Sequence, residues 1–343
     1  MKTHTTLAKN ATSAKISCLG AVAVAAAMLG LSSAAWSKDQ VVIGLITKTE
    51  TNPFFVKMKE GAATEAKKVG AKLITASGKQ DGDTAAQIAA LENMASAGAK
   101  TILITSSGDA IIPTVKKIQA KGVQVIALDS PFEGADALFA TDNYKAGVLI
   151  GEYAKAALGG KPAKIATLDL FPGHPVGAQR HNGFMKGFGL PAADAKSNEL
   201  SKDGAVVCMA DSFGDAAKGQ TAMENCLQKD PSINLVYTIN EPAAAGAHKA
   251  LKKAGKKDVM IVSVDGGCQG IKDTASGVIA ATSQQYPLKM AAMGVAAGMD
   301  FAQNGKKASG YVDTGVTLIA HIAIKGVDSN DTKTGLNLCW GKK

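Results

Sequence analysis

The chain has 343 residues, of which 46% are hydrophobic and 20% are charged, and its 38 lysines and arginines against 29 acidic residues give a formal net charge of +9. This composition is that of a folded chain with one large core or two medium ones. Because the lysines are scattered singly and in pairs, with no basic arm and no interleaved aromatic residues, nucleic acid binding is not expected.

The first 37 residues have the features of a secretory signal peptide. Lysines and no acidic residue accompany an apolar run, Leu19 to Leu31, that is too short to span a membrane, and a cleavage site follows at Ser37. Cys18 stands at the start of this run, whereas a lipoprotein signal has its cysteine after the run, so we expect Cys18 to be removed with the leader. The mature chain, residues 38–343, is therefore predicted to be exported and soluble.

Four cysteines remain beyond the leader, and their wide spacing excludes a C-x-x-C redox centre and a cysteine zinc site: Cys208, Cys226, Cys268 and Cys339. An even number of cysteines in an exported chain predicts disulfides. We expect Cys208 to pair with Cys226 and Cys268 with Cys339. Buried free thiols are the alternative.

From Val41 onward, short apolar runs alternate with helical patterns. The runs predicted as strands are 41–47, 72–76, 101–105, 123–129 and 137–141. The predicted helices between and after them are 53–69, 83–98, 109–121 and 143–158, the first opened by Asn52-Pro53 and ended by Gly70. Such near-continuous apolar strands separated by helices predict a parallel sheet covered on both faces.

The same alternation then starts again. The predicted strands are 164–171, 205–210, 235–240, 259–265 and 279–285, and the predicted helices are 176–188, 215–229, 242–254 and 287–304, before a tail without a regular pattern. Two series of about equal size indicate two α/β lobes rather than one wide sheet. In each lobe a ligand is expected beyond the carboxyl ends of the strands.

Short polar side chains recur where the predicted strands end: Thr47, Thr105, Ser106, Asp129, Asp142, Asn143, Asn240, Glu241, Asp265, Gln284 and Gln285. Any one of them can be a turn former or a helix N-cap. Their repetition at equivalent places indicates a binding site instead. Carboxylates and amides of this kind match the paired donors and acceptors of a polyhydroxylated ligand.

Arg180 is the only arginine in the chain. A guanidinium offers a fixed fork of donors to two adjacent oxygens, which lysine cannot, so we expect a geometric role in binding; a surface cation is the alternative. Phe54 and Phe55, at a predicted strand-to-helix turn, offer aromatic surface for the apolar face of a sugar ring, and Phe213 or Tyr286 offers it elsewhere. Core packing is the alternative for Phe55.

No catalytic pattern is present. The sequence lacks a G-x-G-x-x-G turn after a strand, a G-x-S-x-G elbow, a P-loop and an H-E-x-x-H motif. His174 and His181 have a spacing that is weak evidence for a metal, and nothing makes either Asp129 or Asp265 the proton donor of an acid and base pair. We therefore expect no enzyme, no cofactor and no metal.

A series of motifs matches one family in order along the chain: NPFF with K-x-K-E-G-A, VIALDSP, ATDNYKAG, R-x-N-G-F, TINEPAAAGA, SVDGG and SQQYP. From Val41 to about Ile319 the sequence resembles the periplasmic sugar-binding proteins of the ribose and galactose-binding type, which serve ABC importers. Within that family it is most similar to the fructose binders.

The resemblance implies a monomeric type I periplasmic binding protein, with two doubly wound parallel-sheet lobes joined by a three-segment hinge. The implied N-terminal lobe is 38–142 plus 286–317, and the C-terminal lobe is 143–285 plus 318–343. Closure of the hinge on a monosaccharide, D-fructose by likeness, and delivery to the membrane permease are the implied function. The rival within the same fold is a signalling receptor for a furanose such as autoinducer-2, or for a chemotactic sugar.

The resemblance also implies the sugar-contacting residues, which are Asn52, Phe54, Phe55, Thr105, Ser106, Asp129, Arg180, Asn240, Asp265 and Gln285, with Glu50, Phe213 and Asp215 as further candidates. Two arginines typical of ribose binders are missing. This chain has Ser130 after the aspartate of the fourth strand, and Phe213-Gly214-Asp215-Ala216 where an aromatic-Asp-Arg run is usual. With a longer first loop that includes Glu50, these departures favour a fructose-like ligand over ribose.

Overall fold

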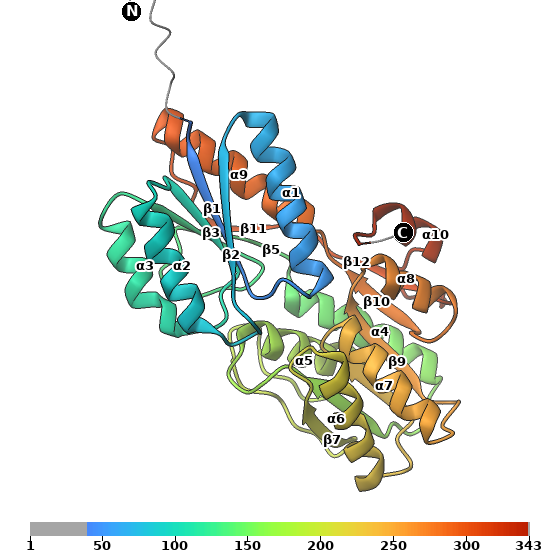
Figure 1. The fold of residues 1–343 in the computed structure, drawn as a ribbon. Helices are drawn as coiled ribbons and strands as arrows, with labels where there is room; N and C mark the ends of the chain where they lie inside the picture. Colours follow the sequence, from blue (N-terminus) through green and yellow to red (C-terminus); the bar gives the residue numbers. More distant parts are fainter. Residues whose placement is uncertain (1–39, 342–343) are drawn as a thin grey trace, which may run out of the picture. The chain divides into compact units, whose positions relative to one another are not determined.

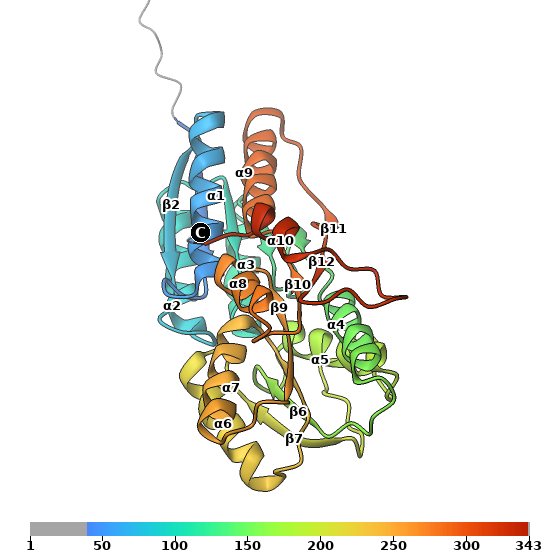
Figure 2. The same ribbon diagram turned by 90° about the vertical axis from the view of Figure 1, so that its right-hand side faces the viewer.

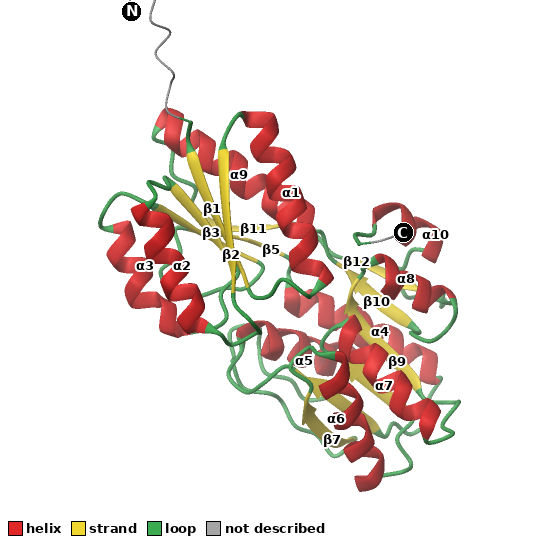
Figure 3. Ribbon diagram, in the orientation of Figure 1, coloured by secondary structure: helices red, strands yellow, loops and turns green. Residues whose placement is uncertain are grey.

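The computed structural model describes residues 40–341. The predicted leader, with its cleavage site at Ser37, lies outside the described residues. Within them the chain forms two six-stranded sheets, each covered by helices (Figure 3). None of the helices in residues 40–341 has the length and apolarity needed to cross a membrane.

The first sheet is parallel throughout, and its strand order is β11 (Gly310–Asp313), β5 (Ala137–Ala140), β4 (Gln124–Leu128), β3 (Thr101–Ile104), β1 (Val42–Thr47) and β2 (Lys72–Ser77). Helices α1 (Pro53–Val69) and α9 (Pro287–Asn304) cover one face, and α2 (Thr84–Ser96) and α3 (Ile112–Gln119) cover the other (Figure 1). The central strands β3 and β4 are buried along their whole length, as expected for a sheet with two covered faces.

The second sheet has the order β12 (Thr317–Ala320), β10 (Ala281–Gln284), β9 (Met260–Asp265), β8 (Leu235–Thr238), β6 (Ile165–Asp169) and β7 (Val206–Asp211), and β12 is antiparallel to the rest. Its faces are covered by α4 (Asn143–Leu158) with α5 (Pro175–Phe188), and by α6 (Ala216–Lys229) with α7 (Glu241–Lys253). Helices α8 (Cys268–Ala275) and α10 (Thr332–Leu338) pack on each other beside β10 and β12 (Figure 2). The predicted fold, two doubly wound α/β lobes, is confirmed.

Several polar residues at the strand ends cap the following helices. The side chains of Asn52, Asp142, Asp215 and Asn240 accept backbone N–H bonds at the starts of α1, α4, α6 and α7. Each cap satisfies a donor that the first helical turn leaves free. Asp129 and Asp265 cap no helix, so another role must explain these two carboxylates.

The prediction of an irregular tail after 304 is wrong. The tail contains β11, β12 and α10, and the sequence reading also missed α8. All four residues of β11 are exposed, β12 is four residues long, and α8 has only eight residues and no side-chain cap, so each of them is too short or too exposed to be recognised from a periodic pattern in the sequence. Thr317, predicted to end an N-terminal lobe segment, pairs with Gln284 in the second sheet, so the last crossing between the sheets lies after Asp313 and before Thr317.

Two disulfides and a close contact between two helices hold the second lobe together. The disulfides join Cys208 to Cys226 and Cys268 to Cys339, the expected pairs. Helices α4 and α5 also approach backbone to backbone through four glycines, Gly147, Gly151, Gly183 and Gly187: a Cβ on any of them would overlap a carbonyl oxygen of the facing helix. This close contact holds α5, which carries Arg180, against the start of α4.

Candidate functional site

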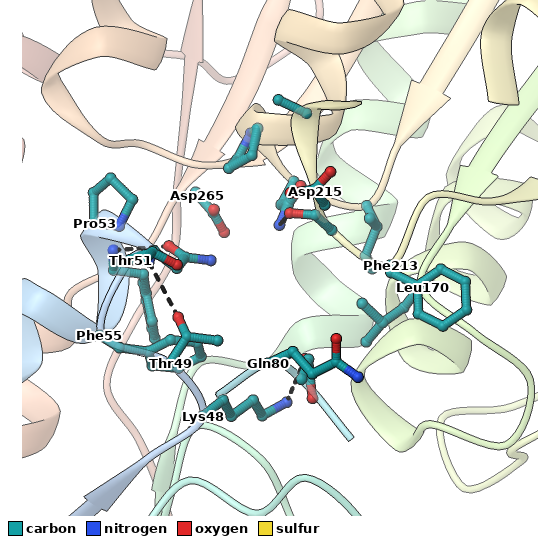
Figure 4. Close-up of a pocket in the computed structure, with 18 of the residues that line it drawn as sticks. Lys48, Thr49, Thr51, Pro53, Phe55, Gln80, Leu170, Phe213, Asp215 and Asp265 are labelled. Carbon is teal, nitrogen blue, oxygen red and sulfur yellow. Dashed lines mark hydrogen bonds and ion pairs between the residues drawn. The ribbon is translucent and has the colours of Figure 1, made fainter. Parts of the chain in front are cut away.

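A cavity of about 590 Å³ lies where strands of both sheets end. Its walls come from the segments after β1, β2 and β4 in the first lobe and after β6, β7, β8 and β9 in the second, with Gln285 after β10. Figure 4 shows Lys48, Thr49 and Phe55 on one side and Phe213 with Asp215 on the other. Placement at the carboxyl ends of parallel strands is the usual position of a ligand in this architecture.

Most of the sequence-predicted contact residues line this cavity: Asn52, Phe54, Phe55, Asp129, Arg180, Phe213, Asp215, Asn240, Asp265 and Gln285. They come from strand ends that are far apart in the sequence. The two sheets therefore bring together residues that the strand-end positions and the resemblance had grouped.

Three predicted residues, Thr105, Ser106 and Glu50, do not line the cavity. Thr105 is turned toward its own sheet, where its hydroxyl lies 3.5 Å from the carbonyl oxygen of Ile46. The Ser106 hydroxyl is used in a local turn with Gly108, at 3.0 Å. Glu50 is an exposed side chain whose carboxylate lies 3.3 Å from Lys59 Nζ. Local hydrogen bonds and an exposed ion pair thus direct these three side chains away from the cavity.

The sequence reading missed several cavity residues from the first lobe, namely Lys48, Thr49, Thr51, Lys79, Gln80 and Asp81. Lys48 is 3% exposed, and its Nζ lies 3.3 Å from Asp81 Oδ2 and 2.9 Å from His174 Nε2. These residues lie a few positions beyond the strand ends: Lys48 directly follows Thr47, and residues 79–81 follow β2. They could have been predicted by including the first few residues after each strand.

Arg180 is held in place by three hydrogen bonds. Its Nε donates to Asn143 Oδ1 at 2.9 Å, and its Nη1 donates to the Ile239 carbonyl at 2.8 Å and to Asp265 Oδ1 at 3.4 Å. The residue is 5% exposed, which excludes a surface cation. Its Nη2 has no partner among residues 40–341, so part of the guanidinium fork is free to donate to a ligand.

The two cavity aspartates are strongly buried. Burial raises the pKa of the Asp129 carboxyl against the opposing charges of Lys48 and Arg180, and it raises the pKa of Asp265 to about 7 against the charge of Arg180. Asp129 Oδ2 accepts from the Ser130 hydroxyl at 3.0 Å, and Asp265 Oδ1 accepts from Gln285 Nε2 at 2.8 Å. Asp129 Oδ1 and Gln285 Oε1 are buried without a partner in the described part of the chain. Unpaired buried acceptors of this kind suit a ligand with several hydroxyl donors.

Glu241 supports the loop that carries Asp265. This buried carboxylate accepts from the backbone N–H groups of Gly266 and Gly267 at 2.7 and 2.9 Å and from the Thr282 hydroxyl at 2.9 Å. Burial, with the nearby charge of Asp265, raises the pKa of Glu241 to about 8. The strand-end residue Glu241 is therefore a support of the cavity and lies outside its lining.

The backbone is strained at the cavity. Among residues 40–341, the non-glycine residues with a positive φ are Asp129 at 63°, Phe213 at 53° and Asp265 at 140°, and all three line the cavity. L-residues adopt this region at a cost, and such residues cluster at functional sites. The strain therefore marks the same place as the polar groups do.

Aromatic side chains supply the apolar part of the walls. Phe54 and Phe55 pack edge to face with centroids 5.3 Å apart, and both also belong to the core of the first lobe. Phe55 therefore packs in the core and also lines the cavity, and its contact with a sugar stays a prediction. Phe213 is 41% exposed, stacks on Phe171 at 5.8 Å and has Lys218 Nζ 3.9 Å above its ring.

The histidines near Arg180 have roles that need no metal. His181 Nδ1 lies 2.9 Å from Asp169 Oδ1 and its Nε2 lies 2.9 Å from the Ser201 carbonyl, while His174 contacts Lys48. In the described part of the chain no three His, Cys, Asp or Glu side chains are grouped so that they could hold a metal ion.

Comparison with known proteins decides the family. Residues 43–307 match the sequence profile of a family described as "Periplasmic binding protein domain". The chain is 34% identical over 281 residues to the ribose import binding protein RbsB of Salmonella typhimurium, covering 81% of this chain and 88% of that protein. The chain belongs to the periplasmic binding protein family. It is also 27% identical over 290 residues to the D-allose-binding periplasmic protein of Escherichia coli, covering 81% and 89% of the two chains.

Solved structures agree with this membership. A carbohydrate transporter solute-binding protein from Agrobacterium radiobacter, in complex with D-arabinose, superposes on this binding protein with a TM-score of 0.72 at 25% identity, covering 83% and 95% of the two chains. A galactofuranose-binding protein gives a TM-score of 0.74 at 22% identity, covering 87% and 97%, which shows the shared fold. The relatives are solute-binding proteins of the type I, sugar-binding branch, and this member of the family is not an enzyme. A particular likeness to fructose binders is not shown and stays a prediction.

Proposed function

We propose that this binding protein captures a monosaccharide between its two lobes in the periplasm and delivers it to the permease of an ABC importer. The observation that carries the proposal is the meeting of Asp129 from the first lobe with Asp265 and Arg180 from the second at one cavity. The proposed lobes are 38–142 with 286–317 and 143–285 with 318–343, and the pairing of Thr317 with Gln284 supports a last boundary a few residues earlier, between Asp313 and Thr317.

Four of the polar wall residues have a proposed role in holding a sugar. The carboxylates of Asp129 and Asp265 accept hydrogen bonds from sugar hydroxyls, and the free N–H groups of Arg180 donate hydrogen bonds to the sugar oxygens. Asn240 uses Oδ1 to cap α7 and one N–H of its amide to bond the Gly214 carbonyl at 3.1 Å, which leaves its second N–H for the ligand. Phe54, Phe55 and Phe213 pack on the apolar faces of the ring.

D-fructose is the sugar that we propose, with ribose and allose as the competing ligands because relatives are named for them. The proposal is supported by the missing arginines. At the position after Asp129, where ribose binders have an arginine, the Ser130 side chain is 1% exposed and donates to Asp129 at 3.0 Å. The cavity therefore has one guanidinium, that of Arg180, and Ser130 itself lies outside the lining.

Ligand capture is expected to proceed by hinge closure. A sugar that contacts both lobes binds the closed form better than any open form, and this difference in affinity shifts the population toward closure. The chain crosses between the sheets after β5, after β10 and after β11, so three short segments can serve as the hinge.

Titration calorimetry of the purified protein tests the proposal. D-fructose, ribose, allose, galactose and glucose are titrated in parallel, and we expect micromolar or tighter binding of fructose. Arg180→Lys is expected to weaken that binding by at least about 2 kcal/mol, roughly 30-fold, because lysine cannot reproduce the fork. Lys186→Arg, an exposed change on the same helix, is the matched control and should bind as the parent does.

The outcomes separate the parts of the proposal. Tight binding of ribose or allose in place of fructose would keep the sugar importer and correct the ligand. Absence of heat with every sugar would contradict the proposed function and leave the signalling furanose as the ligand to test next.

A further inference from the structure

The segment that follows α10 is fixed to the second lobe. Cys339 forms its disulfide with Cys268, the first residue of α8. The next residue, Trp340, accepts a backbone hydrogen bond from Cys268 N at 2.8 Å and forms a parallel bridge with Gly267. Because Asp265 lies two residues before Gly267, this attachment is made beside a loop of the cavity.

The indole of Trp340 reaches the first lobe. Its ring packs edge-on against Phe54 with centroids 5.3 Å apart, it is 4% exposed, and it belongs to the core formed by α1, α9 and the first sheet. Figure 2 shows the C-terminal segment running from α10 toward α1. The segment is therefore a link between the lobes in addition to the three crossings of the chain.

The same indole also holds the hinge. Its Nε1 donates to the backbone carbonyl of Gln285 at 3.1 Å, at the crossing after β10. Both partners of the indole, Phe54 and Gln285, line the cavity, whereas Trp340 does not. Trp340 thus contacts two ligand-facing residues from the side away from the ligand.

We infer that Trp340 is a positioning residue of the sugar site, and that the Cys268–Cys339 disulfide acts through it. The anchored segment fixes the indole, the indole fixes the ring of Phe54 and the backbone of Gln285, and these two residues meet the sugar. Phe54 lies between Phe55 and Trp340, with an edge-to-face contact of 5.3 Å to each, so loss of the indole frees the Phe54 ring to tilt. The inference rests on the proposed function, because it takes a sugar to be the ligand of the cavity.

Binding of variants is the first test. Trp340→Leu is expected to weaken sugar binding about tenfold or more, and Trp340→Phe, which keeps a ring against Phe54, to lose clearly less. Removal of the disulfide as Cys268→Ser with Cys339→Ser is expected to weaken binding about as much as Trp340→Leu does. The matched control, Cys208→Ser with Cys226→Ser, removes the other disulfide and should keep the parent affinity. Equal losses in both serine pairs, or parent affinity in Trp340→Leu, would overturn the inference.

Tryptophan fluorescence without ligand is the second test. The chain has two tryptophans, and Trp36 lies in the predicted leader, so the mature chain 38–343 is a background in which Trp340 is the single reporter. In this background the Cys268 and Cys339 serine pair is expected to shift the emission to the red because the buried indole becomes exposed, and the Cys208 and Cys226 pair is not. An unshifted spectrum would show that the disulfide does not hold the indole. This readout needs no sugar, so it decides the anchoring even if no sugar binds, and it remains usable if Trp340→Leu fails to fold.

Discussion

The contact between Lys48 and His174 joins the lobes through two buried side chains. Lys48 follows β1, and His174 precedes α5. Because an ammonium can only donate, Nε2 of His174 must be the unprotonated nitrogen, and the histidine is neutral. Burial, followed by the charges of Lys48 and Arg180, holds the pKa of His174 well below its usual value. Asp81 balances the charge of Lys48 from the side of the first lobe.

This contact predicts a loss of stability in acid. In the unfolded chain His174 takes up a proton below about pH 6.5, whereas in the folded protein it does not. The free energy of unfolding therefore decreases as the pH is lowered below about 6.5, by up to about 1.4 kcal/mol per pH unit. We expect His174→Gln, which keeps an acceptor for Lys48, to lack this part of the slope. Denaturant unfolding from pH 7.5 to pH 5 measures it.

Comparing the pH profiles of the parent and His174→Gln isolates the contribution of His174. Asp265 and Glu241, whose pKa values burial raises, act in the opposite sense, since their protonated forms are favoured on folding. Both are present in parent and variant, so the difference between the two profiles reports on His174. His248→Gln on α7 is the control, and parallel profiles for the parent and His174→Gln would contradict the prediction.

The glycines between α4 and α5 decide where Arg180 lies. Gly183 on α5 faces the carbonyl oxygen of Tyr144, and Gly147 on α4 faces that of Arg180 itself. The close approach puts the guanidinium Nε within 2.9 Å of Asn143 at the start of α4. Side chains larger than hydrogen cannot fit at these positions unless the helices separate.

Gly183→Ala is therefore expected to be costly. The added methyl overlaps the Tyr144 carbonyl, and overpacking of this kind costs on the order of 2–3 kcal/mol of folding free energy. Because the helix must shift, Arg180 moves as well, and sugar affinity should fall with stability. Denaturant unfolding and calorimetry measure both. Gly204→Ala, where a Cβ meets no atom within 4 Å, is the control; similar values for the two variants would refute the packing argument.

The two disulfides constrain very different lengths of chain. Cys208 and Cys226 are 18 residues apart and link β7 to α6 within one lobe. Cys268 and Cys339 are 71 residues apart, and the chain between them passes through the first sheet at β11 before it returns. The Cys268–Cys339 disulfide therefore restricts the conformational freedom of a longer stretch of the unfolded chain.

Removal of each disulfide by paired serines should show this difference. Chain-entropy estimates give a loss of about 3 kcal/mol for the shorter loop and about 4 kcal/mol for the longer one. The longer loop is expected to cost still more, since the packing of Trp340 is lost with it. Denaturant midpoints and slopes under oxidising conditions measure both losses, and a larger loss from the shorter loop would count against this order.

Local patterns in the sequence were sufficient for most of the elements. Apolar runs and caps such as Asn52, Asp215 and Asn240 indicated where the strands and helices lie. A strand buried on both faces requires consecutive apolar residues, and the free N–H groups of a first helical turn favour a capping side chain, so both features can be recognised in the local sequence. The polar strand ends, the single arginine and the motif resemblance together named ten of the residues that line the cavity. The local signals are missing in short or exposed elements: β11 has no buried residue, and α8 has no side-chain cap.

Tertiary structure alone decided which side chains meet. Thr105 and Lys48 both stand at strand ends, yet Thr105 turns to its own sheet and Lys48 meets His174 from the other lobe. Trp340 belongs to a tail without periodicity, and its contact with Phe54 depends on a disulfide and on the return of the chain to the second sheet. A sequence by itself determines local burial and turns, whereas contacts across lobes depend on sheet order and on how the two sheets face each other, which no local pattern contains.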